Sequence, residues 1–311
     1  MIEAGLMVAR LLHYVAVTTL AGVSLFPLYA YPRGIGYEPT GFSRRIQSVL
    51  FTAASVALLS SILWFIFTVA NMSGTLDGVL DREMLYTVLG ETSFGNVWIA
   101  RLVLSVMMIV MIWNRFDPGS SPRWDVIVSV SAAALLISLA GVGHSQVEEG
   151  IAGMVHVVSD AAHLIAAGAW LGGLVPLVLI LSSYDREVPT ATDHLDQILM
   201  RFSGMGYVAV AVLIGSGLVN SWYLVGNITA SPRTQYGQLL LAKLALFAGM
   251  LLLAVINRFW LVPSMSKARA HRAGSSFWTG RLRTHVLGEQ FLGLAVPMIV
   301  SVLGTIRPAI G

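Results

Sequence analysis

The side chains with the most chemical potential gather in one segment, residues 144–163. His156, Asp160 and His163 are spaced so that they fall on one face of a helix. His144 precedes them by a short loop that contains two glutamates and no lysine or arginine. Imidazoles and carboxylates bind metal cations, and the chain has no cysteine to supply thiolates. We expect His144 to capture a cation, and His156, Asp160 and His163 to bind it further along the helix.

The elements that carry these residues are predicted to be membrane-spanning helices. Of the 311 residues 56% are apolar and 11% are charged, against about 25% charged in soluble domains. About 20 apolar residues are needed to cross the ~30 Å hydrocarbon core. The sequence predicts an all-α polytopic bundle, a single membrane domain over 1–311. Its eight transmembrane helices are expected at 5–29, 46–70, 96–114, 124–143, 154–182, 203–225, 237–257 and 287–306.

The positive charges predict the orientation of these helices. Thirteen lysines and arginines fall in the four loops on one side of the expected bundle, and three fall on the other side. By the positive-inside rule the richer side faces the cytoplasm. We therefore expect a multi-pass protein of the bacterial inner membrane with both termini in the periplasm. The sequence pI of about 9.3 then reflects the basic loop residues that set the topology. We expect membrane lipid as a partner and no nucleic acid.

An internal repeat links the two halves of the chain. The segment 92–95 (Thr-Ser-Phe-Gly) corresponds to 234–237 (Thr-Gln-Tyr-Gly), and Arg101 then corresponds to Lys243 at the same offset. A weaker match at another offset pairs His13 with His163, and also pairs Gly22 with Gly172. The repeats are expected at about 1–143 and 154–311. Four helices in each half would give both halves the same topology, related by an axis along the membrane normal.

The repeat places two histidines at a common depth. At 1.5 Å per residue, His13 lies about 12 Å and His163 about 13 Å inside their expected helices. Arg10 corresponds to Asp160 in the same alignment. Ionisable groups at this depth are costly and indicate function, so we expect His13 and His163 to line one polar site. The alternative is structural, with histidines that join helices and Asp160 paired with Arg10, Arg101 or Lys243.

Several catalytic motifs are absent from the sequence. It contains no Walker A loop, no GxSxG elbow and no HExxH motif. ATP-driven pumping and hydrolase chemistry therefore have no support, and a transporter is favoured over an enzyme.

These residues resemble a known family. The His156-x3-Asp160-x2-His163 pattern, the Trp-Leu-Gly-Gly-Leu run at 170–174, the two Thr-x-Phe/Tyr-Gly segments and the Gly-Glu pair at 288–289 are similar to the copper-resistance protein D family (CopD/PcoD). The resemblance implies an inner-membrane protein of copper homeostasis that transports or handles copper. It also implies work with a periplasmic copper-binding protein of the CopC type, which here must be a separate chain. Copper would then bind at His144, His156, Asp160, His163 and His13.

A second interpretation uses the buried cations. Two histidines at one depth suit bis-imidazole ligation of haem b, and the propionates would meet Arg10, Arg101 and Lys243. The protein would then be a b-type cytochrome that transfers electrons, with copper reduction as one use. An assembly factor without transport is a third interpretation.

Overall fold

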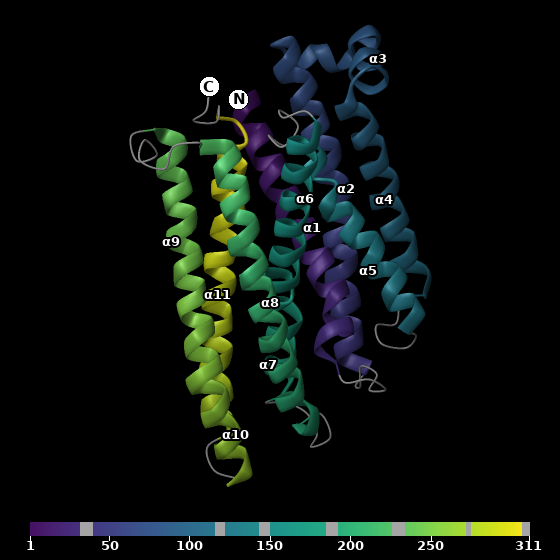
Figure 1. Cartoon of the computed structure of the whole chain (residues 1–311). Helices are drawn as coiled ribbons and strands as arrows, with labels where there is room; N and C mark the ends of the chain where they lie inside the picture. Colours follow the sequence, from purple (N-terminus) through teal and green to yellow (C-terminus); the bar gives the residue numbers. More distant parts are fainter. Residues whose placement is uncertain are drawn as a thin grey trace.

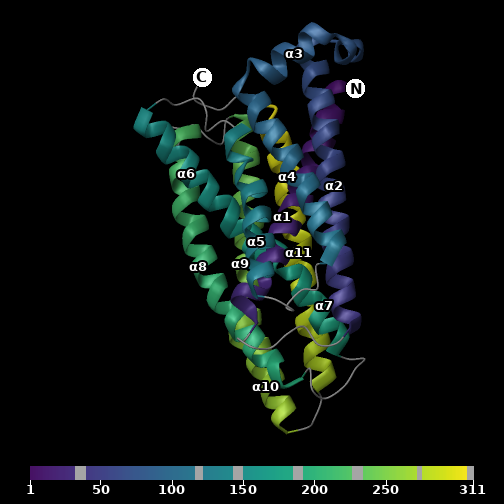
Figure 2. The ribbon, with the colours of Figure 1, turned by 90° about the vertical axis from the view of Figure 1, so that its right-hand side faces the viewer.

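The computed structural model describes residues 1–31, 40–115, 122–142, 150–184, 192–225, 234–271 and 275–306. Within these ranges every regular element is a helix, and the long helices run side by side along one axis (Figures 1 and 2). The α-helices are α1 (Ile2–Ala30), α2 (Thr40–Ser73), α3 (Arg82–Gly90), α4 (Ser93–Arg115), α5 (Pro122–Ile137), α6 (Gly150–Ala167), α7 (Leu174–Tyr184), α8 (Thr192–Val225), α9 (Gln235–Ile256), α10 (Val262–Ala270) and α11 (Ser275–Leu303).

Short helical segments add to these helices within the described residues. The 3-10 turns are η1 (Leu76–Leu80) and η2 (Ala140–Val142), and the π-helical segments are η4 (Gly168–Gly172) and η7 (Asn257–Leu261). Segment η4 joins α6 to α7, and η7 joins α9 to α10, so each forms part of one long rod. Because a π-turn inserts an extra residue, it rotates the later part of a rod relative to the earlier part.

Seven helical rods of the described chain are long and apolar enough to cross a membrane. They match seven of the eight expected spans in order. The remaining expectation, 124–143, coincides with α5, which has 16 residues before the turn at η2. The eighth span therefore stays a prediction.

The expected boundaries were wrong on one side of the bundle. Helix α2 begins at Thr40 rather than 46, α8 at Thr192 rather than 203, and α11 at Ser275 rather than 287. Charged residues in these stretches suggested loops. They lie instead on helical turns that extend the rods beyond their apolar length, because lysine and arginine are good helix formers.

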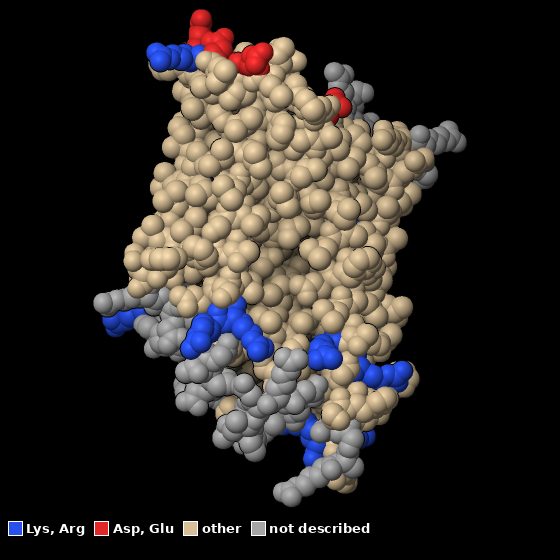
Figure 3. All heavy atoms as spheres, turned by 180° about the vertical axis from the view of Figure 1, so that it is seen from behind, with Lys and Arg blue, Asp and Glu red and all other residues tan. Residues whose placement is uncertain are grey.

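Charge separates the two ends of the molecule. On the face drawn in Figure 3, lysine and arginine side chains gather mainly at the end that carries α10, acidic side chains gather at the end that carries α3, and the band between them shows almost no charge. We call these the basic end and the acidic end. The start of α1 and the end of α11 both lie at the acidic end (Figure 1), where Nη1 of Arg10 donates to the carbonyl of Gly304 at 2.6 Å.

The rods starting at Ile2 and Gly150 cross at the centre without intervening side chains. A Cβ on Gly22 would lie 2.2 Å from the carbonyl oxygen of Gly168 and 2.4 Å from Cα of Gly172. A Cβ on Gly172 would lie 2.3 Å from the carbonyl oxygen of Thr18 and 2.7 Å from Cα of Gly22. Only glycine permits this approach of two backbones.

Around this crossing the two sides of the bundle pack differently. Helices α1, α2, α4 and α5 share one apolar core, in which Trp98, Met108 and Leu135 are fully buried. On the other side α8 packs on α6, whereas α9 packs on α11 rather than on α8. The second side therefore has a looser junction between α8 and α9.

Candidate functional site

His13 lies in a closed hydrogen-bond cluster between α1, α2 and α4. The side chain is fully buried, and its Nδ1 is 3.0 Å from Oγ of Ser60 and 3.1 Å from the carbonyl oxygen of Ala57. Ser60 gives its own proton to the carbonyl of Val56, one turn back on α2. Nδ1 of His13 therefore carries the hydrogen and donates it, which leaves the lone pair on Nε2.

Arg101 fills the position in front of that lone pair. Its Nη2 donates to Nε2 of His13, and the guanidinium is fully buried. Its Cζ lies 5.5 Å from the ring centre of Trp64 and 5.2 Å from that of Trp98, so aromatic faces carry part of the charge stabilisation. Arg101 was expected among the cations of the site, and the structure places it directly on His13.

His163 lies in a second cluster between α6 and α8, built in the same way. Its Nδ1 is 2.9 Å from Oγ of Ser216, and Ser216 donates to the carbonyl of Val212, one turn back on α8. Nδ1 of His163 is therefore also the donor, and its lone pair is on Nε2. No described residue forms a hydrogen bond with that Nε2, and the side chain is half-buried.

Besides Ser216, the second cluster holds three further polar side chains. Asp160, one turn earlier on α6, accepts a hydrogen bond from Nδ2 of Asn220 at 3.2 Å. Lys243 on α9 interacts electrostatically with both Asp160 and His163. Oδ1 of Asn220 is buried and has no hydrogen-bond partner among the described residues. The second cluster thus differs from the first in holding a carboxylate and in leaving one imidazole nitrogen without a hydrogen-bond partner among the described residues.

The remaining predicted residues flank these clusters. His156, one turn before Asp160, is buried and stacks on Tyr223 of α8 with ring centres 4.8 Å apart. Arg10 lies with its Cζ 5.2 Å from the ring centre of Trp64. Its hydrogen bond goes to Gly304, and no ion pair joins Arg10 to Asp160 among the described residues, although the structural alternative allowed one. His144 falls outside the described residues.

The two clusters are neighbours. Tyr14 of α1 interacts electrostatically with Arg101 of the first cluster and with Asp160 of the second. The described residues hold no group of three or more histidine, aspartate and glutamate side chains arranged around a metal ion. His13 and His163 each have their own serine partner on a separate helix, α2 and α8.

Sequence reasoning missed the serines. Ser60 and Ser216 are separated by an offset of 156, close to the offset of 150 between His13 and His163, so the repeat carried a signal for them. A serine within an apolar helix is common in membrane proteins, however, and gives no sign by itself of which histidine it meets.

The comparisons with known proteins agree on one family. The model for the copper resistance protein D-like N-terminal domain matches residues 1–154, and that for copper resistance protein D matches residues 196–303. The chain is 32% identical over 300 residues to "Copper resistance protein D" of Pseudomonas syringae pv. tomato, covering 95% of this chain and 94% of that protein.

Two further relatives have similar identities. "Inner membrane protein YebZ" of Escherichia coli (strain K12) is 29% identical over 303 residues, covering 96% of this chain and 97% of the relative. "Copper transport protein CutJ" of Bacillus subtilis (strain 168) is 29% identical over 293 residues, which are 93% of this chain and 52% of that protein. No solved structure matches the chain. On the extent of these matches, the chain belongs to the copper resistance protein D family.

Proposed function

We propose that this protein carries copper into or across the bacterial inner membrane and that Nε2 of His163 is the central copper ligand. One observation carries the proposal: the N–H of His163 is held by Ser216, while the opposite nitrogen has no hydrogen-bond partner among the described residues. Histidines that bind metals have this arrangement, in which a partner fixes the tautomer and turns the lone pair towards the metal. Asp160 and the unpartnered Oδ1 of Asn220 supply oxygen atoms nearby.

The stripe on α6 gives the copper ion a path. His156, Asp160 and His163 repeat at helical spacing, with about 10 Å of axial rise from first to last. An ion captured at His144 would meet His156 first and His163 last. Copper binds well to imidazole, and a carboxylate offsets its charge.

The first cluster supports the assignment by contrast. In both clusters a serine fixes the same nitrogen of the histidine, but in the first cluster a guanidinium lies in front of Nε2. Arg101 occupies the position that we assign to copper at His163. We therefore place copper at His163 and treat His13 as a closed counterpart.

The two clusters are part of a wider correspondence that favours two four-helix repeats. Oγ1 of Thr92 accepts from the backbone N–H of Gly95 at 3.0 Å, and Oγ1 of Thr234 accepts from that of Gly237 at 3.0 Å. The reciprocal crossing of Gly22 and Gly172 brings equivalent positions into contact, as an axis between the halves requires. We infer eight spans, with α5 as the fourth.

Charge supports the orientation. The basic end (Figure 3) is expected in the cytoplasm, and the acidic end is then expected in the periplasm. The E. coli relative is named an inner membrane protein, the Pseudomonas relative a copper resistance protein and the Bacillus relative a copper transport protein. We extend these roles to this chain and infer that a separate periplasmic protein of the CopC type delivers the copper.

The haem interpretation fits the structure less well. Bis-imidazole ligation needs one free nitrogen on each histidine. Both nitrogens of His13 have protein partners, and a haem iron would have to displace Arg101. The absorption spectrum of the purified protein separates the two functions, because a Soret band would favour the cytochrome.

The test of the proposed function is copper binding by purified protein in nanodiscs. His163→Ala is expected to lose the bound copper, since it removes the ligand. His271→Ala is the control because His271 is exposed beyond the end of α10. Equal copper content in wild type and His163→Ala would overturn the assignment.

A further inference from the structure

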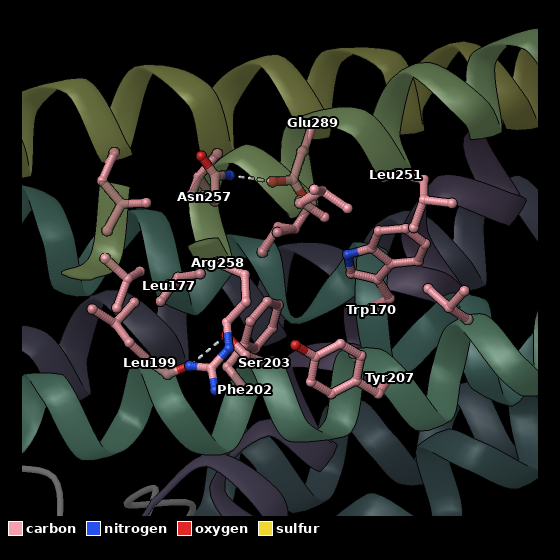
Figure 4. A pocket seen from close by; sticks show the side chains of 18 of the residues that line it. Trp170, Leu177, Leu199, Phe202, Ser203, Tyr207, Leu251, Asn257, Arg258 and Glu289 are labelled. Carbon is pink, nitrogen blue, oxygen red and sulfur yellow. Dashed lines mark hydrogen bonds between the residues drawn. The ribbon is translucent and has the colours of Figure 1, made fainter. Parts of the chain in front are cut away.

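A cavity of about 150 Å³ lies in the half of the bundle nearer the basic end, between η4, α8, η7 and α11 (Figure 4). Its walls are mostly apolar, with polar groups at a few points, as is typical of a ligand site. Polar atoms come from Glu289, Asn257, Arg258, Tyr207 and Ser203. None of these belongs to the histidine clusters.

Glu289 is a buried carboxyl whose hydrogen-bond partners are neutral. Its side chain is 3% exposed, and Nδ2 of Asn257 donates to its Oε1 (Figure 4). The indole of Trp170 also forms a hydrogen bond with it. The structure gives it no ion pair among the described residues. Burying a charged carboxylate inside a membrane helix without a cation costs free energy. A bound proton neutralises Glu289 and removes this cost.

Asn257 adds a second, independent sign of a ligand. Its side chain is 8% exposed, and its Oδ1 points away from Glu289 and has no hydrogen-bond partner among the described residues (Figure 4). A buried acceptor of this kind needs a donor. The adjoining cavity has room for several water molecules, which would supply donors and a path for a proton.

Both π-helical segments contribute residues to the cavity around Glu289. Trp170 lies in η4, and Asn257 and Arg258 lie in η7. π-Turns in membrane and soluble helices occur frequently at functional sites, because the inserted residue re-aims side chains. Here the two segments direct an indole and an amide towards one carboxyl on α11.

The cavity lies further along the rod that carries His163 of the second cluster. Trp170 follows His163 by seven residues, about 10 Å further along the same rod. On α9, Lys243 is followed one turn later by Phe247, whose ring centre is 6.0 Å from that of Trp170 in an edge-to-face contact. Trp170 thus lines the Glu289 cavity and lies on the same rod as His163.

We propose that Glu289 is a proton-binding site whose proton exchanges with the basic end as copper moves through the His163 cluster. In the step, the O–H bond of the Glu289 carboxyl breaks and the proton passes to water in the cavity, with no electron transferred. Arg258 of η7, Tyr207 of α8 and His285, one turn before Glu289 on α11, are the ionisable groups around this route. His285 precedes the span expected at 287–306, and the structure places it within α11.

The carboxyl itself is tested by infrared difference spectroscopy of the protein in nanodiscs. Wild type is expected to show the carbonyl stretch of a protonated carboxyl, losing intensity as the pH of the medium rises. The band is expected to be absent from Glu289→Gln and retained in Glu83→Gln, because Glu83 is exposed on α3. If wild type shows no such band, or if the band persists in Glu289→Gln, the proton site is overturned.

The coupling rests on the proposed function and is tested separately in proteoliposomes with a trapped pH dye. Addition of copper is expected to move protons in wild type and in Glu83→Gln, and this movement is expected to be lost in Glu289→Gln. Copper bound at His163 should be unchanged in Glu289→Gln. Equal proton movement in all three proteins contradicts coupling through Glu289. Absence of bound copper in wild type contradicts the proposed function, and the infrared band still decides the proton site.

Discussion

At the residue scale, one hydroxyl decides which nitrogen of His163 is available. Ser216 accepts the hydrogen on Nδ1, and the lone pair of Nε2 is left for a ligand. Loss of an outer partner of this kind lowers metal affinity by about 10–100-fold. Ser216→Ala is therefore expected to weaken copper binding by at least about tenfold in a chelator competition assay. Ser60→Ala is the matched control, because it acts on His13 and should leave the affinity unchanged.

Arg101 offers a test of the comparison between the clusters. Arg101→Ala removes the guanidinium from Nε2 of His13, so that each imidazole then has one nitrogen without a protein partner. We expect the copper content of purified protein, measured by elemental analysis, to rise by one equivalent. The added equivalent should vanish in the double variant His13→Ala/Arg101→Ala. Unchanged stoichiometry in Arg101→Ala would mean that the position in front of His13 is not equivalent to the copper position.

The sequence could predict part of this chemistry. The spacing of His156, Asp160 and His163 indicated a stripe on one helix, and the structure places them on α6. The cluster around Glu289 could not be found in the same way. Glu289 and Asn257 are 32 residues apart, and their contact depends on how two rods turn towards each other. Such a contact is set by packing, which has no local pattern in the sequence.

At the element scale, the approach of two rods depends on Gly22. A Cβ there would fall within 2.5 Å of backbone atoms of Gly168 and Gly172, which cannot move aside as a flexible side chain would. Gly22→Ala is expected to lower the stability by about 1–3 kcal/mol, seen as a lower Tm in detergent. Gly204→Ala on α8 is the control, since a Cβ at Gly204 meets nothing within 4 Å and alanine favours the helix. A Tm for Gly22→Ala equal to that of Gly204→Ala would contradict the account.

The helices themselves followed from hydropathy, whereas their ends and their irregular turns did not. Apolar runs indicate the part of a helix that lies in hydrocarbon. Helices α8 and α11 begin 11 and 12 residues before their expected apolar spans, in charged sequence. The segments η4 and η7 share a Trp-Leu pair, but such a pair does not by itself predict a π-turn. Helix α3 was not predicted either, although Asp81 caps it by accepting from the backbone N–H of Glu83 at 2.9 Å.

At the scale of the whole molecule, charge distribution predicts how the protein lies in the membrane. A reporter that is active only in the periplasm is expected to be active when fused after Gly311, because the last helix ends at the acidic end. The same reporter fused after His271, at the basic end, is expected to be inactive. Activity after His271 with none after Gly311 would reverse the orientation.

The loose junction between α8 and α9 makes the bilayer part of the structure. In the rods that begin at Ile2 and Gly150, half of the most apolar window is buried by protein, compared with 11% in α8 and 6% in the rod that begins at Gln235. Acyl chains must therefore cover most of these two helices. Lipid there covers helix faces that protein would cover elsewhere. A detergent that replaces the lipid changes the surroundings of the two helices that flank the second cluster. Acyl-chain length and order then become variables of the protein's own structure, as temperature or salt would be for a soluble domain.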